Sequence, residues 1–184
     1  MHAVAVTILV VWIAFWIYWF IAAASGTKAG RTRWGQFVGF RLAIFLLIVV
    51  LVRARVWNGH ATITNDPWLQ AIGLVIFLSG LALAIWARLY LGRNWGTPMT
   101  EKVDPELVTT GPYKKVRHPI YSGIILAMIG TAVAVSWYWL FAAGLVGAYF
   151  IYSAFREERY IAGRFPDTYP GYKRSTKMLL PFIF

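Results

Sequence analysis

Long apolar runs constrain what this chain can fold into more than any other feature of its sequence. The runs cover about 3–24, 37–52, 69–91, 119–135 and 138–155, and about 20 apolar residues suffice to cross the hydrocarbon core of a bilayer. Because backbone polar groups in lipid must be satisfied within one segment, each run predicts a helix. The sequence therefore predicts an all-α integral membrane protein with about five transmembrane helices. Four or six are the alternatives, because the second and fourth runs are short.

The first run is interpreted as a retained span rather than a cleaved signal peptide. It lacks a basic segment before the apolar stretch, and that stretch is longer than the apolar core of a signal peptide. The sequence shows no internal repeat and no linker. We therefore expect one domain over 1–184, in which 1–91 form three transmembrane helices and 92–184 form a loop, a helical hairpin and a tail.

The composition excludes several classes of site. The 184 residues include no cysteine, so disulfides, thiolate catalysis and cysteine-bound metals are excluded, and three histidines are too few for us to expect a metal site. A net charge of +11 would suggest nucleic acid as the partner of a soluble protein. Here the basic residues flank apolar runs, so we expect membrane lipid as their partner and no nucleic acid.

The basic residues also predict the orientation in the membrane. In a five-span topology the 25–36 loop, the 92–118 loop and the tail from 156 lie on one side and hold most of the lysines and arginines. The positive-inside rule then places the N-terminus outside the cell membrane and the C-terminus in the cytosol. Tryptophans and one tyrosine are expected to form interfacial belts, with Trp57, Trp68, Trp137, Tyr138 and Trp139 outside and Trp34 and Trp95 inside.

Residues 111–123, GPYKKVRHPIYSG, place a basic and aromatic cluster at the mouth of the fourth run. Pro119 is suited to the first position of a helix, where its missing N–H would be unpaired anyway. Arg117 and His118 then precede the first turn, whose free amides and positive dipole favour an anion. Tyr113, His118 and Tyr121 indicate a lined ligand pocket, and a lipid-phosphate anchor with a helix cap is the alternative.

A second cluster, Glu157 and Glu158, follows the fifth run. Adjacent helical residues point about 100° apart, so we expect one glutamate to bind a ligand and the other to pair with an arginine; a solvated helix end is the alternative. The tail after 164, rich in Pro, Gly and Tyr, is expected to be a loop folded back onto the cytosolic face. Arg41 and Arg88 lie one turn from the cytosolic ends of their spans, where they either reach headgroups or serve the function.

The two clusters and the tail together resemble a known family. The ordered residues are Arg117, His118, Pro119, Tyr121, Gly123, Glu157, Glu158, Phe165, Tyr169, Tyr172 and Pro181. This order resembles the C-terminal half of isoprenylcysteine carboxyl methyltransferases and their bacterial and archaeal relatives, over roughly 92–184. The resemblance implies an integral membrane methyltransferase that uses S-adenosylmethionine, bound by the cytosolic C-terminal region.

The resemblance also implies roles for individual residues. The implied cofactor contacts are Leu107, Val108, Tyr113, His118, Pro119, Ile120, Tyr121 and Glu157. The family's substrate-contacting arginine, four residues before the matching glutamate, is replaced here by Ser153. Arg156, Arg88 or Arg41 could substitute for it. We therefore expect Arg156, Glu158 and Arg88 to be catalytic, with Glu158 or His118 as the base where the acceptor must lose a proton.

The function expected on these grounds is methyl transfer to a lipophilic, membrane-borne acceptor. Carboxyl O-methylation of an isoprenylcysteine-like, prenylated substrate is favoured, and N- or S-methylation of another small lipophile or phospholipid is the alternative. An NADPH-dependent reductase of the sterol type and a non-enzymatic lipid-binding protein are further alternatives. Nothing in the sequence indicates the oligomeric state.

Overall fold

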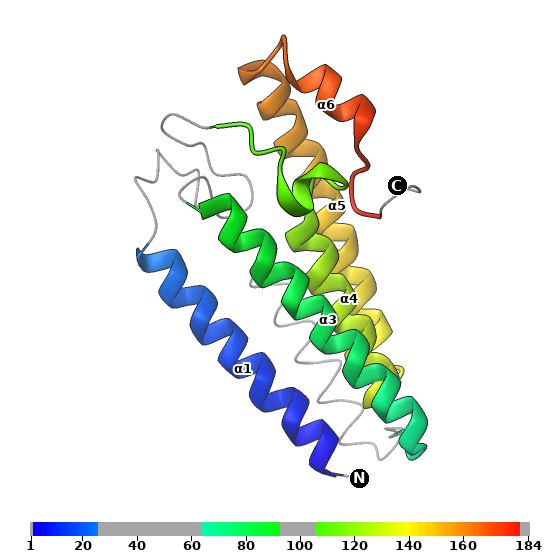
Figure 1. Ribbon diagram of the computed structural model, residues 1–184. Coiled ribbons are helices and arrows are strands. Elements are labelled where there is room, and N and C mark those ends of the chain that lie inside the picture. The colour runs from blue at the N-terminus through cyan, green and yellow to red at the C-terminus, as the bar shows by residue number, and fades with distance from the viewer. Residues whose placement is uncertain (1, 26–63, 93–105, 181–184) are drawn as a thin grey trace.

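The computed structural model describes residues 2–25, 64–92 and 106–180, and their regular structure is entirely helical (Figure 1). The α-helices are α1 (His2–Ser25), α3 (Pro67–Leu91), α4 (Pro119–Ala134), α5 (Trp139–Arg164) and α6 (Tyr169–Ser175), and a 3₁₀ helix, η2, covers Gly111–Lys114. Helices α3, α4 and α5 lie side by side, with α1 across the face of α3 and α4 (Figure 1). The all-α prediction is confirmed for these residues.

The apolar runs correspond to the helices with one change. Helices α1, α3 and α4 match the runs at 3–24, 69–91 and 119–135, and the run at 37–52 lies outside the described residues. Helix α5 continues nine residues beyond 155, the expected end of the fifth run. Arg156–Arg164 contain good helix formers, so the helix continues where the apolar stretch stops.

Two of the described helices, α3 and α5, are long and apolar enough to cross a membrane. The apolar segments Ala3–Trp19 and Pro119–Ala134 are shorter. By length and composition these two helices fit the prediction of membrane spans, while the number of spans and the orientation stay predictions. Arg41, Trp34, Trp57 and Trp95 lie outside the described residues.

Local signals in the sequence fix where the helices begin. The Asp66 side chain accepts a 2.8 Å hydrogen bond from the Trp68 amide, and Pro67 follows at the first helical position of α3. Pro119 takes the same position in α4, as predicted. At the far end of the bundle, opposite η2 and α6, the Thr64 amide donates to the Val135 carbonyl, which ties the start of α3 to the turn between α4 and α5.

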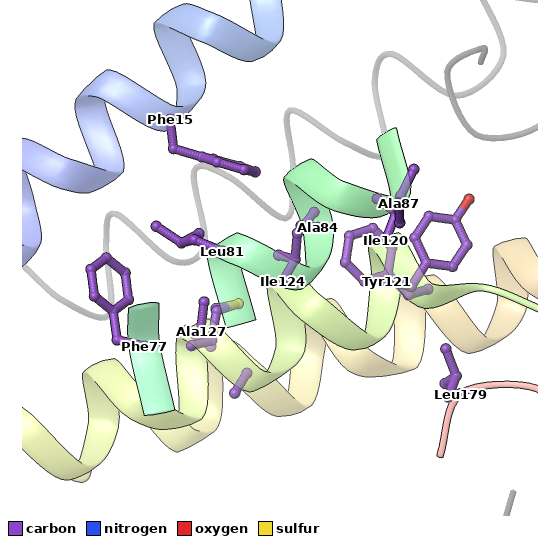
Figure 2. Packing of buried hydrophobic residues seen from close by; sticks show 14 of the residues in the cluster. Phe15, Phe77, Leu81, Ala84, Ala87, Ile120, Tyr121, Ile124, Ala127 and Leu179 are labelled. Atoms are coloured by element: carbon purple, nitrogen blue, oxygen red, sulfur yellow. The ribbon is translucent and has the colours of Figure 1, made fainter. Parts of the chain in front are cut away.

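Small residues bring α3 and α4 into backbone contact. A Cβ added to Gly80 would lie 2.4 Å from the Ala127 nitrogen, and one added to Gly130 would lie 2.3 Å from the Phe77 nitrogen. Without a strong hydrophobic drive between helices in lipid, such close approach is a main source of packing energy. Figure 2 shows the resulting seam, in which alanines of α3 meet isoleucines and Tyr121 of α4.

Helix α1 joins this pair through aromatic packing and one polar contact. Trp12 packs against Phe77 of α3, with ring centroids 5.5 Å apart. Its indole nitrogen donates a 3.1 Å hydrogen bond to the Thr131 hydroxyl of α4. Thr131 in turn donates to the Ala127 carbonyl, so both polar groups are satisfied inside the helical bundle.

We predict that Gly80→Ala destabilises the protein while Gly144→Ala does not. The methyl group at position 80 meets the backbone of α4, whereas position 144 on α5 has nothing within 4 Å. The expected cost at position 80 is about 1–3 kcal/mol, typical of overpacking, and the control should be neutral or slightly stabilising because alanine favours helix. Thermal unfolding in detergent measures both, and equal midpoints would contradict the close-contact interpretation.

Candidate functional site

Three segments distant in sequence meet at one end of the bundle. They are residues 115–118 before α4, the charged end of α5, and α6 with the tail that follows it (Figure 1). The tail runs parallel to 115–118: the Arg117 amide donates to the Lys177 carbonyl (2.8 Å) and the His118 amide donates to the Met178 carbonyl (3.0 Å). The tail is folded back as predicted, but the prediction of a loop throughout was wrong, because Tyr169–Ser175 form α6.

A buried ion pair joins these segments. Arg117 Nε lies 2.6 Å from Glu158 Oε1, and the two side chains are 9% and 4% exposed. Lys173 of α6 reaches the other carboxylate oxygen at 2.8 Å, with its side chain 52% exposed. Arg117 also donates from Nη1 to the Thr176 carbonyl at 2.6 Å. Glu158 is therefore the glutamate that pairs with an arginine, and its partner is 41 residues away rather than a neighbour on α5.

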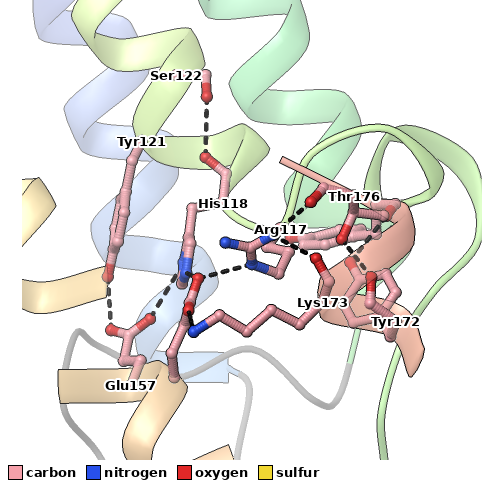
Figure 3. A network of polar contacts seen from close by, with 10 residues as sticks. Arg117, His118, Tyr121, Ser122, Glu157, Tyr172, Lys173 and Thr176 are labelled. Carbon is pink, nitrogen blue, oxygen red and sulfur yellow. Dashed lines mark hydrogen bonds and ion pairs between the residues drawn. The ribbon is translucent and has the colours of Figure 1, made fainter. Parts of the chain in front are cut away.

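The other glutamate faces a different pair of side chains. The Tyr121 hydroxyl donates a 2.6 Å hydrogen bond to Glu157 Oε1, and His118 Nδ1 lies 3.6 Å from Glu157 Oε2. The second ring nitrogen of His118 lies 3.5 Å from Glu158 Oε1, so the imidazole stands between the two carboxylates (Figure 3). One glutamate, Glu158, thus pairs with an arginine as expected, His118 lies near both carboxylates, and ligand binding by Glu157 stays a prediction.

Stacked rings continue from this cluster into the bundle. His118 and Tyr121 have centroids 5.4 Å apart with an angle of 2° between the ring planes, and Tyr121 stacks on Phe150 at 4.4 Å and 7°. The stack fixes the rotamers of His118 and Tyr121 and so aims both at Glu157. Phe150 was missed in the sequence, although its place two helical turns before Glu157 puts it on the same face of α5.

The remaining expected contact residues are buried or half-buried. Pro119 and Ile120 are buried at the start of α4, and Leu107 and Val108 are half-buried. Buried Tyr113 donates from its hydroxyl to the Ala87 carbonyl of α3 at 3.3 Å, and its own carbonyl accepts from the Tyr172 hydroxyl at 2.8 Å. Tyr113 thus links α3 to α6.

The two arginines expected to be catalytic differ in burial and position. Arg88 is buried and donates to the carbonyls of Gly92 and Ala22, both at 3.1 Å, so it ties the end of α3 to α1. Arg156 is exposed on α5, and two helical steps of about 100° separate it from buried Glu158. Ser153, one turn before Glu157, is fully buried. Of the three residues expected to be catalytic, Glu158 is the one placed against His118.

The phenols of this region are held in their neutral form. Burial raises the pKa of Tyr113 and Tyr169 well above the usual value. Burial raises the pKa of Tyr172 to about 12. The charge of Arg117 lowers this pKa, and the Glu158 carboxylate raises it. Tyr113 and Tyr172 therefore keep the protons that they donate to the Ala87 and Tyr113 carbonyls.

The chain is similar to known proteins over the region that contains this cluster. The family model described as phospholipid methyltransferase matches residues 68–168, which include His118, Tyr121 and Glu157. A nickel-cobalt-cadmium resistance protein of Alcaligenes xylosoxydans xylosoxydans is 29% identical over 88% of this chain. A methanethiol S-methyltransferase of Bradyrhizobium diazoefficiens is 38% identical over 83% of it. A protein-S-isoprenylcysteine O-methyltransferase of Xenopus laevis is 35% identical over 63% of it.

This chain spans only part of those relatives, at 71%, 59% and 42% of their respective lengths. The matches confirm the resemblance to membrane methyltransferases seen in the residue pattern. They leave the acceptor open, because the relatives' names include both a thiol and an isoprenylcysteine.

We predict that Arg117→Leu costs far more stability than Lys173→Gln. Loss of Arg117 leaves Glu158 buried with one partly exposed cation, and the expected cost is about 3 kcal/mol, the lower end for breaking a buried pair. Loss of half-exposed Lys173 should cost under about 1 kcal/mol. Denaturant unfolding in detergent gives both free energies, and similar values for the two variants would show that Arg117 contributes no more than Lys173 to holding Glu158.

Proposed function

Since this chain belongs to the phospholipid methyltransferase family, we propose that it transfers the methyl group of S-adenosylmethionine to a lipophilic acceptor in the membrane. The chain is a methyltransferase by its family and its relatives. The observation that carries the finer proposal is the constellation of Tyr121, Glu157 and His118 at the start of α4, inside the matched range.

The residues present fit a ligand with a cationic sulfur, an amino acid end and a ribose. The Glu157 side chain is 24% exposed and held at one oxygen by Tyr121, so its carboxylate is preorganised to accept hydrogen bonds from hydroxyl or amino groups. The start of α4 offers backbone amides that the His118 side chain does not cap, which suits a carboxylate. Aromatic rings of the stack beside Glu157 suit a cation.

Further residues would complete this binding region. The proposed cofactor contacts are those implied by the resemblance: Leu107, Val108, Tyr113, His118, Pro119, Ile120, Tyr121 and Glu157. When bound, S-adenosylmethionine would supply a methyl group on a positively charged sulfur. The chain's own residues would then mainly hold and align the reactants and keep the site dry.

The chain can also supply a base where the acceptor carries a proton. His118 lies between the two glutamates, with a ring nitrogen 3.5 Å from Glu158 Oε1, so a proton taken by the imidazole would be stabilised by a buried carboxylate. A carboxylate acceptor needs no base, and a thiol does. Glu158 would position His118, since its own oxygens are engaged by Arg117 and Lys173.

The acceptor that the residue pattern favours is the carboxyl group of an isoprenylcysteine-like lipid. A thiol is the second candidate, and the observation that favours it is Ser153, a fully buried neutral residue at the position where the resemblance expects an arginine for the substrate. The name of the methanethiol S-methyltransferase relative, which covers 83% of this chain, also supports the thiol.

We predict that Glu157→Gln weakens binding of S-adenosylhomocysteine by about 1–3 kcal/mol, because a charge-assisted hydrogen bond is lost. Tyr121→Phe should weaken it less, since the charge of Glu157 remains. Isothermal titration of the detergent-purified protein measures both, with Asp167→Asn, an exposed carboxylate, as the matched control. NADPH is titrated in parallel: binding of NADPH alone would replace the methyltransferase proposal with the reductase alternative.

We predict that the acceptor can be assigned from the bond that is formed. The reconstituted protein is supplied with S-adenosylmethionine labelled in its methyl group and with either N-acetyl-S-farnesylcysteine or a long-chain alkanethiol. An ester product releases labelled methanol in base, whereas a thioether does not. A thiol reaction should also accelerate as the pH rises, because a larger fraction of the alkanethiol is then the nucleophilic thiolate, and the carboxyl reaction should be flat above neutral pH. Label in neither product would exclude both acceptors.

A further inference from the structure

The outward face of α5 changes its chemistry abruptly near residue 155. From Phe141 to Phe155 the exposed positions are apolar or aromatic. The next exposed positions are Arg156 and Arg159. Their neighbours Glu157 and Glu158 turn inward to Tyr121 and Arg117, so the acidic residues of this turn are withdrawn from the surface and the arginines are left on it.

Aromatic side chains flank both arginines. Residues four apart on a helix are neighbours, so Tyr152, Arg156 and Tyr160 form one row and Phe155 and Arg159 form the adjacent row. All three rings are exposed. An aromatic ring next to an arginine is the arrangement found where a helix passes from hydrocarbon to headgroups, with the ring at the interface and the guanidinium at the phosphate.

The length of α5 agrees with this boundary. Exposed Trp137 and neighbouring Tyr138 mark the other end of the apolar stretch. From 138 to 155 the helical rise is about 26 Å at about 1.5 Å per residue, close to the roughly 30 Å core of a bilayer. With α5 as a membrane span, this length puts Phe155 where the hydrocarbon ends and Arg156 and Arg159 at the level of the phosphates.

The charge at this end of the bundle selects the kind of lipid. Among the described residues, the other exposed cations here are Lys114, Lys115, Arg164, Lys173, Arg174 and Lys177. The exposed acidic residues of 106–180 are Glu106 and Asp167. Such an excess of positive charge favours a headgroup with net negative charge over a zwitterionic one.

We propose that Arg156 and Arg159, framed by Tyr152, Phe155 and Tyr160, form a binding surface for the phosphate of an anionic phospholipid. At a spacing of three residues both guanidinium groups can reach one phosphate, and arginine binds phosphate through two parallel hydrogen bonds. Arg156, which the residue pattern marked as catalytic, thereby acts at the lipid surface. This inference does not depend on the methyl acceptor.

The test compares protein in nanodiscs of dioleoylphosphatidylcholine alone with protein in an equal mixture of that lipid and dioleoylphosphatidylglycerol. The anionic lipid should raise the thermal unfolding midpoint of the wild type, because a ligand of the folded state stabilises it. The double variant Arg156→Gln/Arg159→Gln should match the wild type in phosphatidylcholine and lose most of the rise. The control Lys114→Gln/Arg174→Gln removes the same charge at the same end of the bundle and should retain the rise.

Four outcomes would overturn the proposal. They are a wild type indifferent to phosphatidylglycerol, an equal rise in all three proteins, an equal loss of the rise in both double variants, and an Arg156→Gln/Arg159→Gln midpoint that is already lowered in phosphatidylcholine. Inorganic phosphate added to phosphatidylcholine discs separates the two sources of the anion. No shift is expected there, and a rise equal to that with the anionic lipid would show that free phosphate is the ligand.

Discussion

The buried pair between Arg117 and Glu158 is the contact on which the rest of this site depends. Two charges at 9% and 4% exposure are costly to bury unless their other hydrogen-bonding atoms are also satisfied. Here Arg117 reaches the Thr176 carbonyl, and Glu158 meets Lys173 and the edge of His118. One pair therefore joins the entrance of α4, the end of α5 and the tail.

The pair also sets the rotation of α5 about its own axis. With Glu158 turned toward Arg117, Glu157 must point about 100° away, and it meets Tyr121 there. The same rotation leaves Arg156 and Arg159 on the outer surface. The four consecutive charged residues 156–159 are thus divided between an internal site and an external face. The close contact between α3 and α4 at Gly80 and Gly130 holds α4, which carries Tyr121, in place.

Local rules allowed much of this to be predicted from the sequence. Pro119 marks a helix start by its missing amide, and the different directions of the Glu157 and Glu158 side chains follow from helical geometry. Local rules do not predict which cation a buried carboxylate pairs with. Glu158 has arginines on both sides of the Glu pair, yet it binds one 41 residues away, because packing of the tail over 115–118 decides which cation is brought to it.

Helix α6 was missed and the contacts of Arg88 were left open for a related reason. Pro and Gly within Tyr169–Ser175 predict a loop, but Pro170 is tolerated in the first turn and docking onto Tyr113 and Glu158 stabilises the short helix. Arg88 was left between reaching headgroups and serving the function. In the structure Arg88 donates to backbone carbonyls at the end of its own helix and in α1. The second of these contacts depends on where α1 lies, which the sequence around Arg88 does not predict.

The placement of the site on α5 limits the acceptors that can reach it. On the proposed lipid surface Arg156 and Arg159 lie at the phosphates, and Glu157 lies between them in sequence and within about 3 Å of their level along the helix. Glu157 with Tyr121 and His118 is then at headgroup depth rather than within the hydrocarbon. An acceptor held by the bilayer must present its nucleophile at that depth, as an amphiphile does with its polar end. Both the carboxyl group of a prenylated cysteine and the thiol of an alkyl chain meet this condition. Fully buried Ser153, one turn before Glu157, is neutral and brings no positive charge to a carboxylate, so on the proposed function it favours the thiol.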